Sequence, residues 1–332
     1  MIVDRMKVSI CVPVYGVEKF IERCVVSLFE QSYKDIEYIF VDDCSKDKSV
    51  EVINEVAKKY PQRIDSIKII HHKKNRGLAA ARNTAVFEAT GDIIMHVDSD
   101  DYIAIDAVSD IVSMFLQTNA DIVYFDYVSV ENNEKVYHRQ PDIINPKDKT
   151  ISLLSKNYSV GVVLASYKRS LYVNYGIKES EGVNFSEDFH TSPRLSYYAS
   201  RIAILHKPLY YYICMNAESY TATFSESHAS QLMKSIDILK DFFSDKEQEY
   251  IIQLYESELY SITQLLNQIV RSDGGKKLFE KYKNRARLID KEYWAKLPVP
   301  RKVVLYLPYG LTLKAYIKIV TSLKNKKIFF NS

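Results

Sequence analysis

The chain has 332 residues, of which 47% are apolar and 26% are charged, and its formal net charge is +3. This balance is that of a globular protein of about two domains, and so small a net charge predicts no nucleic-acid partner. No apolar run reaches the roughly 18 residues that a membrane span needs, and the four cysteines have no metal-ligand spacing. Residues 1–7 carry mixed charge and do not resemble a signal peptide, so we expect a cytoplasmic location.

The first 130 residues alternate between strand-like and helical patterns. Short β-branched runs predict buried strands over residues 8–12, 38–41, 67–70, 93–97 and 122–125. Apolar residues at helical spacing lie between these runs, over residues 17–28, 52–57, from Gly77 onward, and 104–117. The alternation predicts βαβ units, and therefore a Rossmann-like α/β fold with a mostly parallel central sheet flanked by helices.

The pattern changes twice after residue 130. Polar residues and prolines over residues 131–149 predict a surface connection, after which strand-like and helical signals resume. Beyond Ser225 the apolar spacing is helical. We therefore expect an α/β domain over residues 1–225 and a helical C-terminal extension over residues 226–332.

Three carboxylates, those of Asp98, Asp100 and Asp101, follow the fourth predicted strand within four residues. Carboxylates this close repel one another unless a cation lies among them, and hard oxygen ligands suit Mg²⁺ or Mn²⁺. Ligands of open parallel sheets bind beyond the carboxyl ends of the strands, where this turn is predicted to lie. The alternative is a solvated turn in which Asp100 or Asp101 favours the start of the next helix.

Two common phosphate-binding motifs are missing from the sequence. No GxGxxG pattern follows the first predicted strand, which argues against a dinucleotide-dependent dehydrogenase. No GxxxxGK[ST] loop is present either, which argues against a P-loop phosphotransferase.

Four segments, taken in order and spacing, resemble family 2 of the glycosyltransferases. Residues 8–15 resemble the opening strand of that family, residues 38–45 its second strand and acidic turn, residues 75–83 its loop-to-helix segment, and residues 91–101 the strand with the second acidic turn. The resemblance fades in the C-terminal part. It implies a GT-A fold and an inverting hexosyltransferase with a nucleotide-diphospho-sugar donor such as a UDP-sugar. Residues 1–130 would form the nucleotide-sugar half of the catalytic domain, and residues 131–225 the acceptor half.

The resemblance also implies roles for individual residues on the donor side. The nucleotide pocket would be lined by Pro13, Val14 and Tyr15, and Asp42 would accept a hydrogen bond from the base. Asp98, followed by Ser99, would lie near the ribose, and the metal ion, Mn²⁺ or Mg²⁺, would be held by Asp100 together with Asp98.

Three further candidates for donor binding lie in the loop-to-helix segment: Asn75, Arg76 and Arg82. Guanidinium groups suit a diphosphate. Each arginine could instead be a surface charge or a partner of Asp42 or Asp43.

On the acceptor side, the resemblance assigns the catalytic base to the pair Glu187-Asp188. Inversion needs a base that takes the proton of the attacking hydroxyl, and a well-placed carboxylate can do this. We favour Asp188, with Glu187 orienting the acceptor or pairing with a cation. A start of a helix with Ser186 as its cap is compatible with this role.

Two positions depart from the family pattern. Gly16 stands where relatives usually have an asparagine, and Cys214 stands where relatives often have an arginine. A thiol cannot neutralise phosphate charge. The sequence therefore leaves open the alternative of a catalytically inactive nucleotide-sugar-binding or scaffold protein on a GT-A frame.

The last forty residues, from Tyr293 to Ser332, contain basic residues and no acidic ones. Such a segment, interleaved with apolar residues, can lie on an anionic membrane surface. This would suit an enzyme of surface-polysaccharide synthesis with a saccharide or lipid-linked acceptor, peripheral on the inner face of the cell membrane. The alternatives are a helix that packs on the rest of the protein and a dimer contact.

Overall fold

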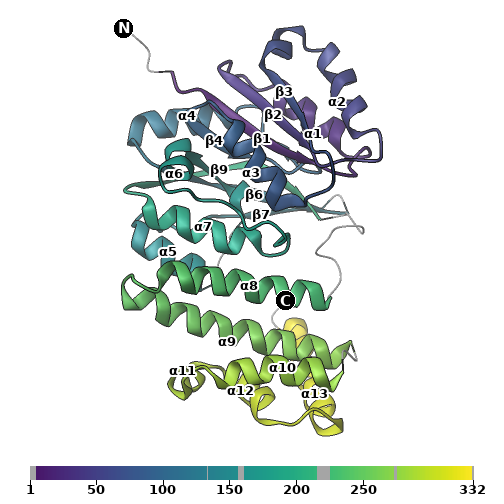
Figure 1. Cartoon of the computed structure of the whole chain (residues 1–332), viewed down its shortest axis with the longest axis vertical. Coiled ribbons are helices and arrows are strands. Elements are labelled where there is room, and N and C mark those ends of the chain that lie inside the picture. Colours follow the sequence, from purple (N-terminus) through teal and green to yellow (C-terminus); the bar gives the residue numbers. More distant parts are fainter. Residues whose placement is uncertain (1–4, 133, 156–160, 215–224, 273–274, 331–332) are drawn as a thin grey trace. The chain divides into compact units, whose positions relative to one another are not determined.

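The structure is a computed structural model, and it describes five stretches of the chain, residues 5–132, 134–155, 161–214, 225–272 and 275–330, with side chains up to residue 320. The chain forms two compact units, Met1–Thr223 and Phe224–Ser332 (Figure 1). The division into a catalytic domain over residues 1–225, with a nucleotide-sugar half and an acceptor half, and a C-terminal region over residues 226–332 stays a prediction.

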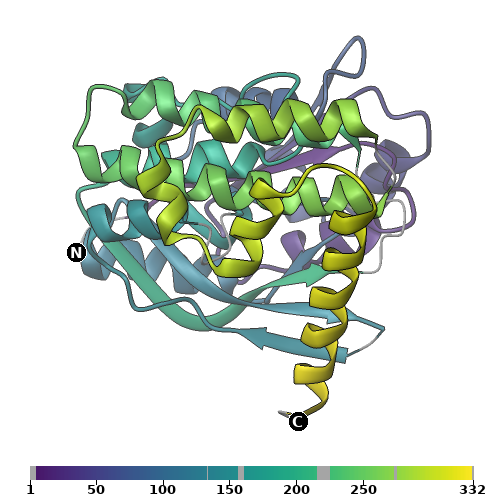
Figure 2. The ribbon, with the colours of Figure 1, turned by 90° about the horizontal axis from the view of Figure 1, so that it is seen from below.

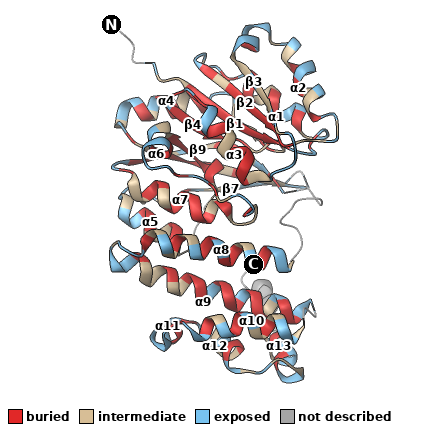
Figure 3. Ribbon diagram, viewed as in Figure 1, coloured by how far each residue is buried: buried red, intermediate tan, exposed pale blue. Residues whose placement is uncertain are grey.

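The first unit is built around one sheet with the strand order β3-β2-β1-β4-β8-β6-β9-β5, in which β7 also pairs with β6. The strands are β1 (Val8–Val14), β2 (Ile36–Asp42), β3 (Ile67–His71), β4 (Ile93–His96), β5 (Tyr102–Ile103), β6 (Ile122–Glu131), β7 (Glu134–His138), β8 (Ala165–Lys168) and β9 (Ile202–Ile213). All five strands predicted from β-branched runs are present. Strands β1, β2 and β4 are buried almost throughout, as expected for a sheet covered on both faces (Figure 3).

The sheet is parallel on the side where the first four predicted strands lie and mixed on the other side, which contains the fifth, β6. Strands β3, β2, β1 and β4 are mutually parallel. Strand β8 then pairs antiparallel with both β4 and β6, and β9 pairs parallel with β6. The carboxyl ends of β2, β3 and β4 therefore lie at one edge of the sheet.

The helices of this unit are α1 (Ile21–Phe29), α2 (Ser49–Lys58), α3 (Leu78–Glu88), α4 (Ala107–Thr118), α5 (Pro146–Leu154), α6 (Arg169–Asn174) and α7 (Glu187–Tyr198). The first four match the predicted helices. Helix α3 packs against β1 and β2, and α4 packs against β6 and β9. The chain enters α3 through Gly77, whose φ of 90° favours glycine.

The described residues among 131–149 lie mainly at the surface, as predicted, but the prediction of a mere connection missed a strand and the start of a helix. After Glu131 the chain turns back as β7, which is exposed along most of its length and so has no apolar alternation to reveal it. Helix α5 follows, and the side chain of Asn145 caps it by accepting the backbone N–H groups of Lys147 and Asp148.

The second unit is helical, as predicted, with α8 (Glu226–Phe243), α9 (Gln248–Arg271), α10 (Lys276–Arg287), α11 (Lys291–Lys296), α12 (Val299–Tyr306) and α13 (Leu311–Phe330). Helix α9 packs against each of the other helices of this unit. Helix α13 is continuous and runs toward the C-terminus (Figure 2). Within the described residues, no helix combines the length and the apolar character that a membrane crossing requires.

Candidate active site

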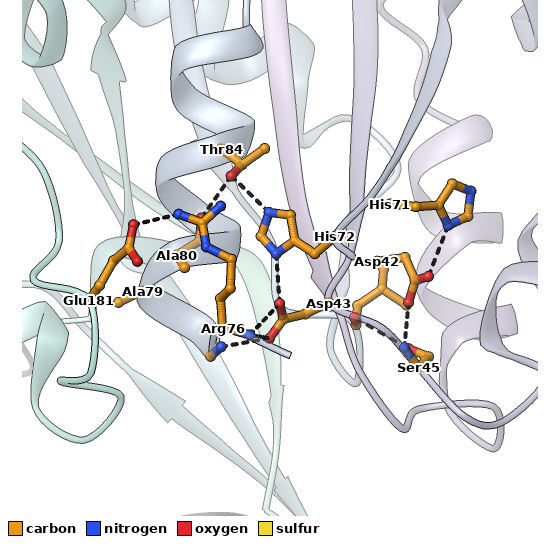
Figure 4. Close-up of polar contacts among 12 residues, drawn as sticks. Asp42, Asp43, Ser45, His71, His72, Arg76, Ala79, Ala80, Thr84 and Glu181 are labelled. Carbon is orange, nitrogen blue, oxygen red and sulfur yellow. Dashed lines mark hydrogen bonds and ion pairs between the residues drawn. The ribbon is translucent and has the colours of Figure 1, made fainter. Parts of the chain in front are cut away.

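The carboxyl end of β2 brings Asp42 into register with two neighbouring strands. Asp42 pairs with Val14 of β1 on one side and with His71 of β3 on the other. Its carboxylate accepts the Ser45 N–H at Oδ1, at 2.8 Å, and Oδ2 lies 2.9 Å from His71 Nδ1 (Figure 4). Partial burial alone would raise the pKa of Asp42, but the hydrogen bonds from His71 and Ser45 outweigh it and lower the pKa below its ordinary value. Asp42 is thus an ionised hydrogen-bond acceptor at the edge of the sheet.

Asp43, the next residue, is buried and organises the start of α3. Its carboxylate accepts the backbone N–H groups of Arg76, at 2.9 Å, and of Gly77, at 2.7 Å. His72 Nδ1 lies 2.6 Å from Asp43 Oδ1, and His72 Nε2 lies 2.9 Å from the Thr84 hydroxyl (Figure 4). Asp43 therefore ties the end of β2 to the loop that leads into α3.

The acidic turn after β4, residues 98–101, is held against β9 by hydrogen bonds of its backbone and of the Asp101 side chain. Tyr210 of β9 donates its hydroxyl to Asp101, at 2.6 Å, and accepts the backbone N–H of Asp98. The backbone N–H of Ile213 also donates to Asp101. Asp101 is buried, so it holds the turn against β9 while Asp98 and Asp100 stay partly exposed. The cap expectation for Asp100 or Asp101 was wrong, because α4 starts at Ala107, with Asp106 at its N-cap.

Arg82 lies at the centre of a buried ionic cluster. Its Nη2 donates to Asp98 Oδ1 at 2.8 Å, and its Nη1 donates to Glu187 Oε1 at 2.9 Å and to Asp188 Oδ1 at 3.0 Å. Glu179 Oε1 is 3.6 Å from the same Nη1. Arg82 is neither a surface charge nor a partner of Asp42 or Asp43. It connects the acidic turn after β4 with the first turn of α7.

Burial dominates the electrostatics of the carboxylates around Arg82. It raises the pKa of Asp188, although the charge of Arg82 and the Val162 N–H oppose the shift. Burial, and then the charge of Asp188, raise the pKa of Glu187 to about 8. Burial likewise raises the pKa of Glu179 well above its ordinary value. One guanidinium among several carboxylates therefore favours a state in which some of them are protonated near neutral pH.

The structure places the predicted pair Glu187-Asp188 at the start of α7, with Ser186 at the N-cap position. Glu187 is buried, whereas the side chain of Asp188 is 23% exposed. Asp188 is therefore the more accessible of the two candidate bases.

The remaining predicted donor residues differ in accessibility. Pro13 and Val14 are buried in β1, and Tyr15, beyond the end of the strand, is 52% exposed. Ser99 is buried inside the acidic turn. Asn75 is exposed.

Arg76 is also exposed and pairs through Nη2 with Glu181, at 2.6 Å. This ion pair links the loop before α3 to the loop before α7. The backbone N–H of Arg76 donates to the Asp43 carboxylate.

Sequence reasoning missed three residues that the structure brings into this region: His71, Glu179 and Tyr210. His71 could have been found from its place at the end of a predicted strand, beside Asp42. Glu179 and Tyr210 join the site through contacts across 97 and 109 residues of sequence, with Arg82 and Asp101 respectively. No local pattern signals contacts of that kind.

The acidic turn contains oxygen ligands of the kind that a divalent cation prefers. Within the described part of the chain, no three or more His, Cys, Asp and Glu side chains are grouped so as to enclose a metal ion. A nucleotide-bound Mg²⁺ or Mn²⁺ takes one or two carboxylates and completes its shell with phosphate oxygens and water. Asp98 and Asp100 supply carboxylates of this kind at the sheet edge, although Oδ1 of Asp98 already receives Arg82.

The family model described as Glycosyl transferase family 2 matches residues 9–176, half of the chain. The chain belongs to glycosyltransferase family 2. The matched residues contain Asp42, Arg82 and the whole acidic turn. Asp188 lies beyond the match, and its role stays a prediction.

Among curated relatives, the chain is 31% identical over 212 residues to the uncharacterized glycosyltransferase EpsJ of Bacillus subtilis, which covers 62% of this chain and 60% of the relative. It is 35% identical over 138 residues to glycosyltransferase GlyA of Streptococcus pneumoniae, covering 42% of this chain and 19% of that relative. The chain thus spans less than two thirds of the length of either relative.

Among solved structures, the fold matches Staphylococcus aureus TarS 1–349 in complex with UDP-GlcNAc, with a TM-score of 0.70 and 19% identity over 97% of this chain and 92% of that one. The mannosyltransferase PcManGT of Pyrobaculum calidifontis, in complex with GDP-Man and Mn²⁺, matches with a TM-score of 0.54 and 21% identity, over 97% of this chain and 87% of that one. These likenesses establish the GT-A fold predicted from the sequence.

Proposed function

We propose that this protein is an inverting glycosyltransferase that moves a hexose from a UDP-sugar to a saccharide or lipid-linked acceptor during surface-polysaccharide synthesis. The observation that carries this proposal is the position of Arg82. One guanidinium contacts both the acidic turn, where a donor would bind, and Asp188, which would activate the acceptor. The donor site and the catalytic base would then both be in contact with the buried guanidinium of Arg82.

The donor would bind along the carboxyl edge of the parallel strands. Asp42 is an ionised acceptor, which suits the N3–H of a uracil base. Tyr15, exposed beyond β1, would cover the nucleotide, and Asp98 would lie near the ribose. The UDP-GlcNAc in the TarS complex and the GDP-Man in the PcManGT complex support a nucleotide-diphospho-sugar as the donor class.

Asp100, assisted by Asp98, would hold a divalent cation, with Mn²⁺ or Mg²⁺ as the candidates. Once bound, such an ion would stabilise the charge of the departing diphosphate as a Lewis acid. The Mn²⁺ in the PcManGT complex supports a divalent cation as the class of cofactor. Arg82 would keep the carboxylate of Asp98 in place at the side of the turn.

Asp188 would take the proton from the attacking acceptor hydroxyl. Its raised pKa makes it a stronger base than a solvated aspartate, and a base whose pKa is closer to the working pH is more effective. Glu187 is less exposed and would be mainly protonated near neutral pH. Glu187 would therefore donate a hydrogen bond or orient the acceptor and leave the proton transfer to Asp188.

The proposal includes peripheral membrane contact, but through fewer residues of the basic tail than the sequence suggested. Three of the basic residues of the tail contact their own unit: Lys296 pairs with Glu256, Arg301 lies 3.5 Å from the Tyr260 ring centroid, and Lys302 donates to the Ala295 carbonyl. On α13, Leu313 and Ile317 are buried. Truncation of the tail would therefore expose apolar residues and would not test membrane binding cleanly.

The opposite side of α13 is the better candidate for an anionic membrane. Leu311 is 86% and Ile319 is 59% exposed, at a spacing that puts them on one helix face. Lys318 is exposed next to Ile319. The double variant Leu311→Gln with Ile319→Gln should lower co-sedimentation with anionic vesicles and leave UDP binding intact. Equal sedimentation of the variant and the unchanged protein would reject this part of the proposal.

The enzymatic proposal is tested by release of UDP from UDP-sugars in Mn²⁺. We expect slow donor hydrolysis by the unchanged protein, abolished by Asp100→Ala, with Asp188→Asn retaining UDP affinity. Binding of UDP-sugars without turnover of any donor, in the presence of a broad acceptor panel, would favour the inactive scaffold instead. Failure to bind any nucleoside diphosphate would reject both.

A further inference from the structure

Two consecutive histidines at the end of β3 face two consecutive aspartates at the end of β2. In the parallel register of these strands, His71 lies opposite Asp42. Its Nδ1 is 2.9 Å from Asp42 Oδ2, and His72 Nδ1 is 2.6 Å from Asp43 Oδ1 (Figure 4). The two pairs have the same kind of contact at neighbouring positions, so they can be compared directly.

The inner pair has a complete set of structural contacts. The side chains of His72 and Asp43 are 6% and 4% exposed. His72 also reaches Thr84 of α3, and Asp43 receives two backbone N–H groups from the loop before that helix. This pair therefore holds β2, β3 and α3 together.

The outer pair has a different environment. The side chain of His71 is 60% exposed, while that of Asp42 is 11% exposed. A ring so exposed contributes little apolar burial. The role of His71 therefore depends on what its contact does to the carboxylate of Asp42.

Both oxygens of the Asp42 carboxylate are in hydrogen-bond contact. Ser45 N–H donates to Oδ1, and the geometry lets His71 Nδ1–H donate to Oδ2. An ionised carboxylate has about four acceptor positions, so two such bonds fix its plane and leave acceptor capacity for a ligand. The contact with His71 also contributes to the lowered pKa of Asp42.

We propose that His71 is a positioning residue for the donor base, which orients the carboxylate of Asp42 to accept a base N–H. The inference rests on the proposed function, in which Asp42 contacts the base. The role of His71 adds a preference for bases with a ring N–H at the hydrogen-bonding edge, such as uracil or guanine. Cytosine would be disfavoured, because its N3 is an acceptor. The base would approach beside the exposed imidazole ring.

The test compares two substitutions of His71 by calorimetric titration with UDP in Mn²⁺. His71→Phe keeps a ring without an N–H donor, and we expect UDP to bind about tenfold more weakly, the loss of one hydrogen bond to a charged group. His71→Asn retains an N–H donor near the position of Nδ1, and we expect it to restore most of the affinity. Inorganic pyrophosphate should bind equally to all three proteins, because it has no base.

A matched control comes from the same strand. Lys68 of β3 is exposed and pairs with a carboxylate, that of Glu88, before the carboxyl end of the strand. Lys68→Ala should leave the affinity for UDP unchanged. His72→Phe, in contrast, should lower the melting temperature, whereas His71→Phe should not.

The outcomes separate the inference from the proposed function. If His71→Phe binds UDP as tightly as the unchanged protein while Asp42→Asn binds it weakly, the role of His71 is refuted and the donor site stands. An equal loss of affinity for UDP and for pyrophosphate in His71→Phe would also refute base positioning. If the unchanged protein does not bind UDP or GDP, both proposals fail.

Discussion

The two groups of carboxylates at the edge of the sheet have opposite environments. Asp42 and Asp43, after β2, receive N–H groups from the backbone and lie beside one histidine each. Asp98, Glu187 and Asp188 share a single buried guanidinium. Hydrogen bonds lower the pKa of Asp42, whereas burial raises the pKa of Glu187 and of Asp188.

We expect the contrast between Asp42 and Asp188 to separate ligand recognition from proton transfer. A carboxylate that stays ionised and fixed by N–H donors suits a ligand contact that must not change during a reaction. A carboxylate with a raised pKa can gain and lose a proton near neutral pH, as general-base catalysis requires. Three measurements test whether the two groups are distinct in this way.

The largest expected effect is that of Asp188→Asn on turnover. Removal of the base should lower kcat by about 10²- to 10⁴-fold, while the affinity for UDP, measured by calorimetry, changes little. Glu187→Gln should be the milder variant, because Glu187 is assigned no proton transfer. A kcat within a few-fold of the unchanged protein for Asp188→Asn, with a large loss for Glu187→Gln, would reverse the assignment.

Asp43→Asn should lower the free energy of unfolding by about 3 kcal/mol, because an amide placed at a buried carboxylate site leaves N–H groups without acceptors. The matched variant is Asp42→Asn. There the amide oxygen can still accept the Ser45 N–H, and His71 can switch tautomer to accept the amide N–H, so we expect a cost below about 1 kcal/mol. Urea unfolding of both variants measures the difference. Equal destabilisation would contradict a structural role for Asp43 and a binding role for Asp42.

The smallest effect concerns pH. The pKa of Glu187 in the folded protein is about 8, above its ordinary value of 4.5, so the folded state binds this proton more tightly than the unfolded chain does. The resulting stabilisation is full below about pH 4.5 and is lost as the pH rises through 8.

Glu187→Gln, which stays neutral, should therefore remove part of the decrease in melting temperature between about pH 5 and pH 9. We expect a difference of a few degrees by scanning calorimetry. Parallel melting curves for the two proteins across this range would contradict a protonated Glu187.

The sequence by itself determined the parallel half of the sheet, the first four helices, the helical nature of the second unit and the acidic turn at the end of β4. These features follow from local patterns: β-branched runs, helical spacing of apolar residues, and polar residues directly after a strand. Such patterns did not reveal β7, because an exposed edge strand has no alternation of apolar and polar residues.

Only the tertiary structure decided how the charges pair. From the sequence, Arg82 could be a surface charge, a partner of Asp42 or Asp43, or a diphosphate ligand. The fold instead buries the Arg82 side chain of α3 against Glu187 at the start of α7, 105 residues away. A buried guanidinium must find carboxylate partners within hydrogen-bond distance, and which carboxylates are in reach depends on how α3, β4 and α7 pack together.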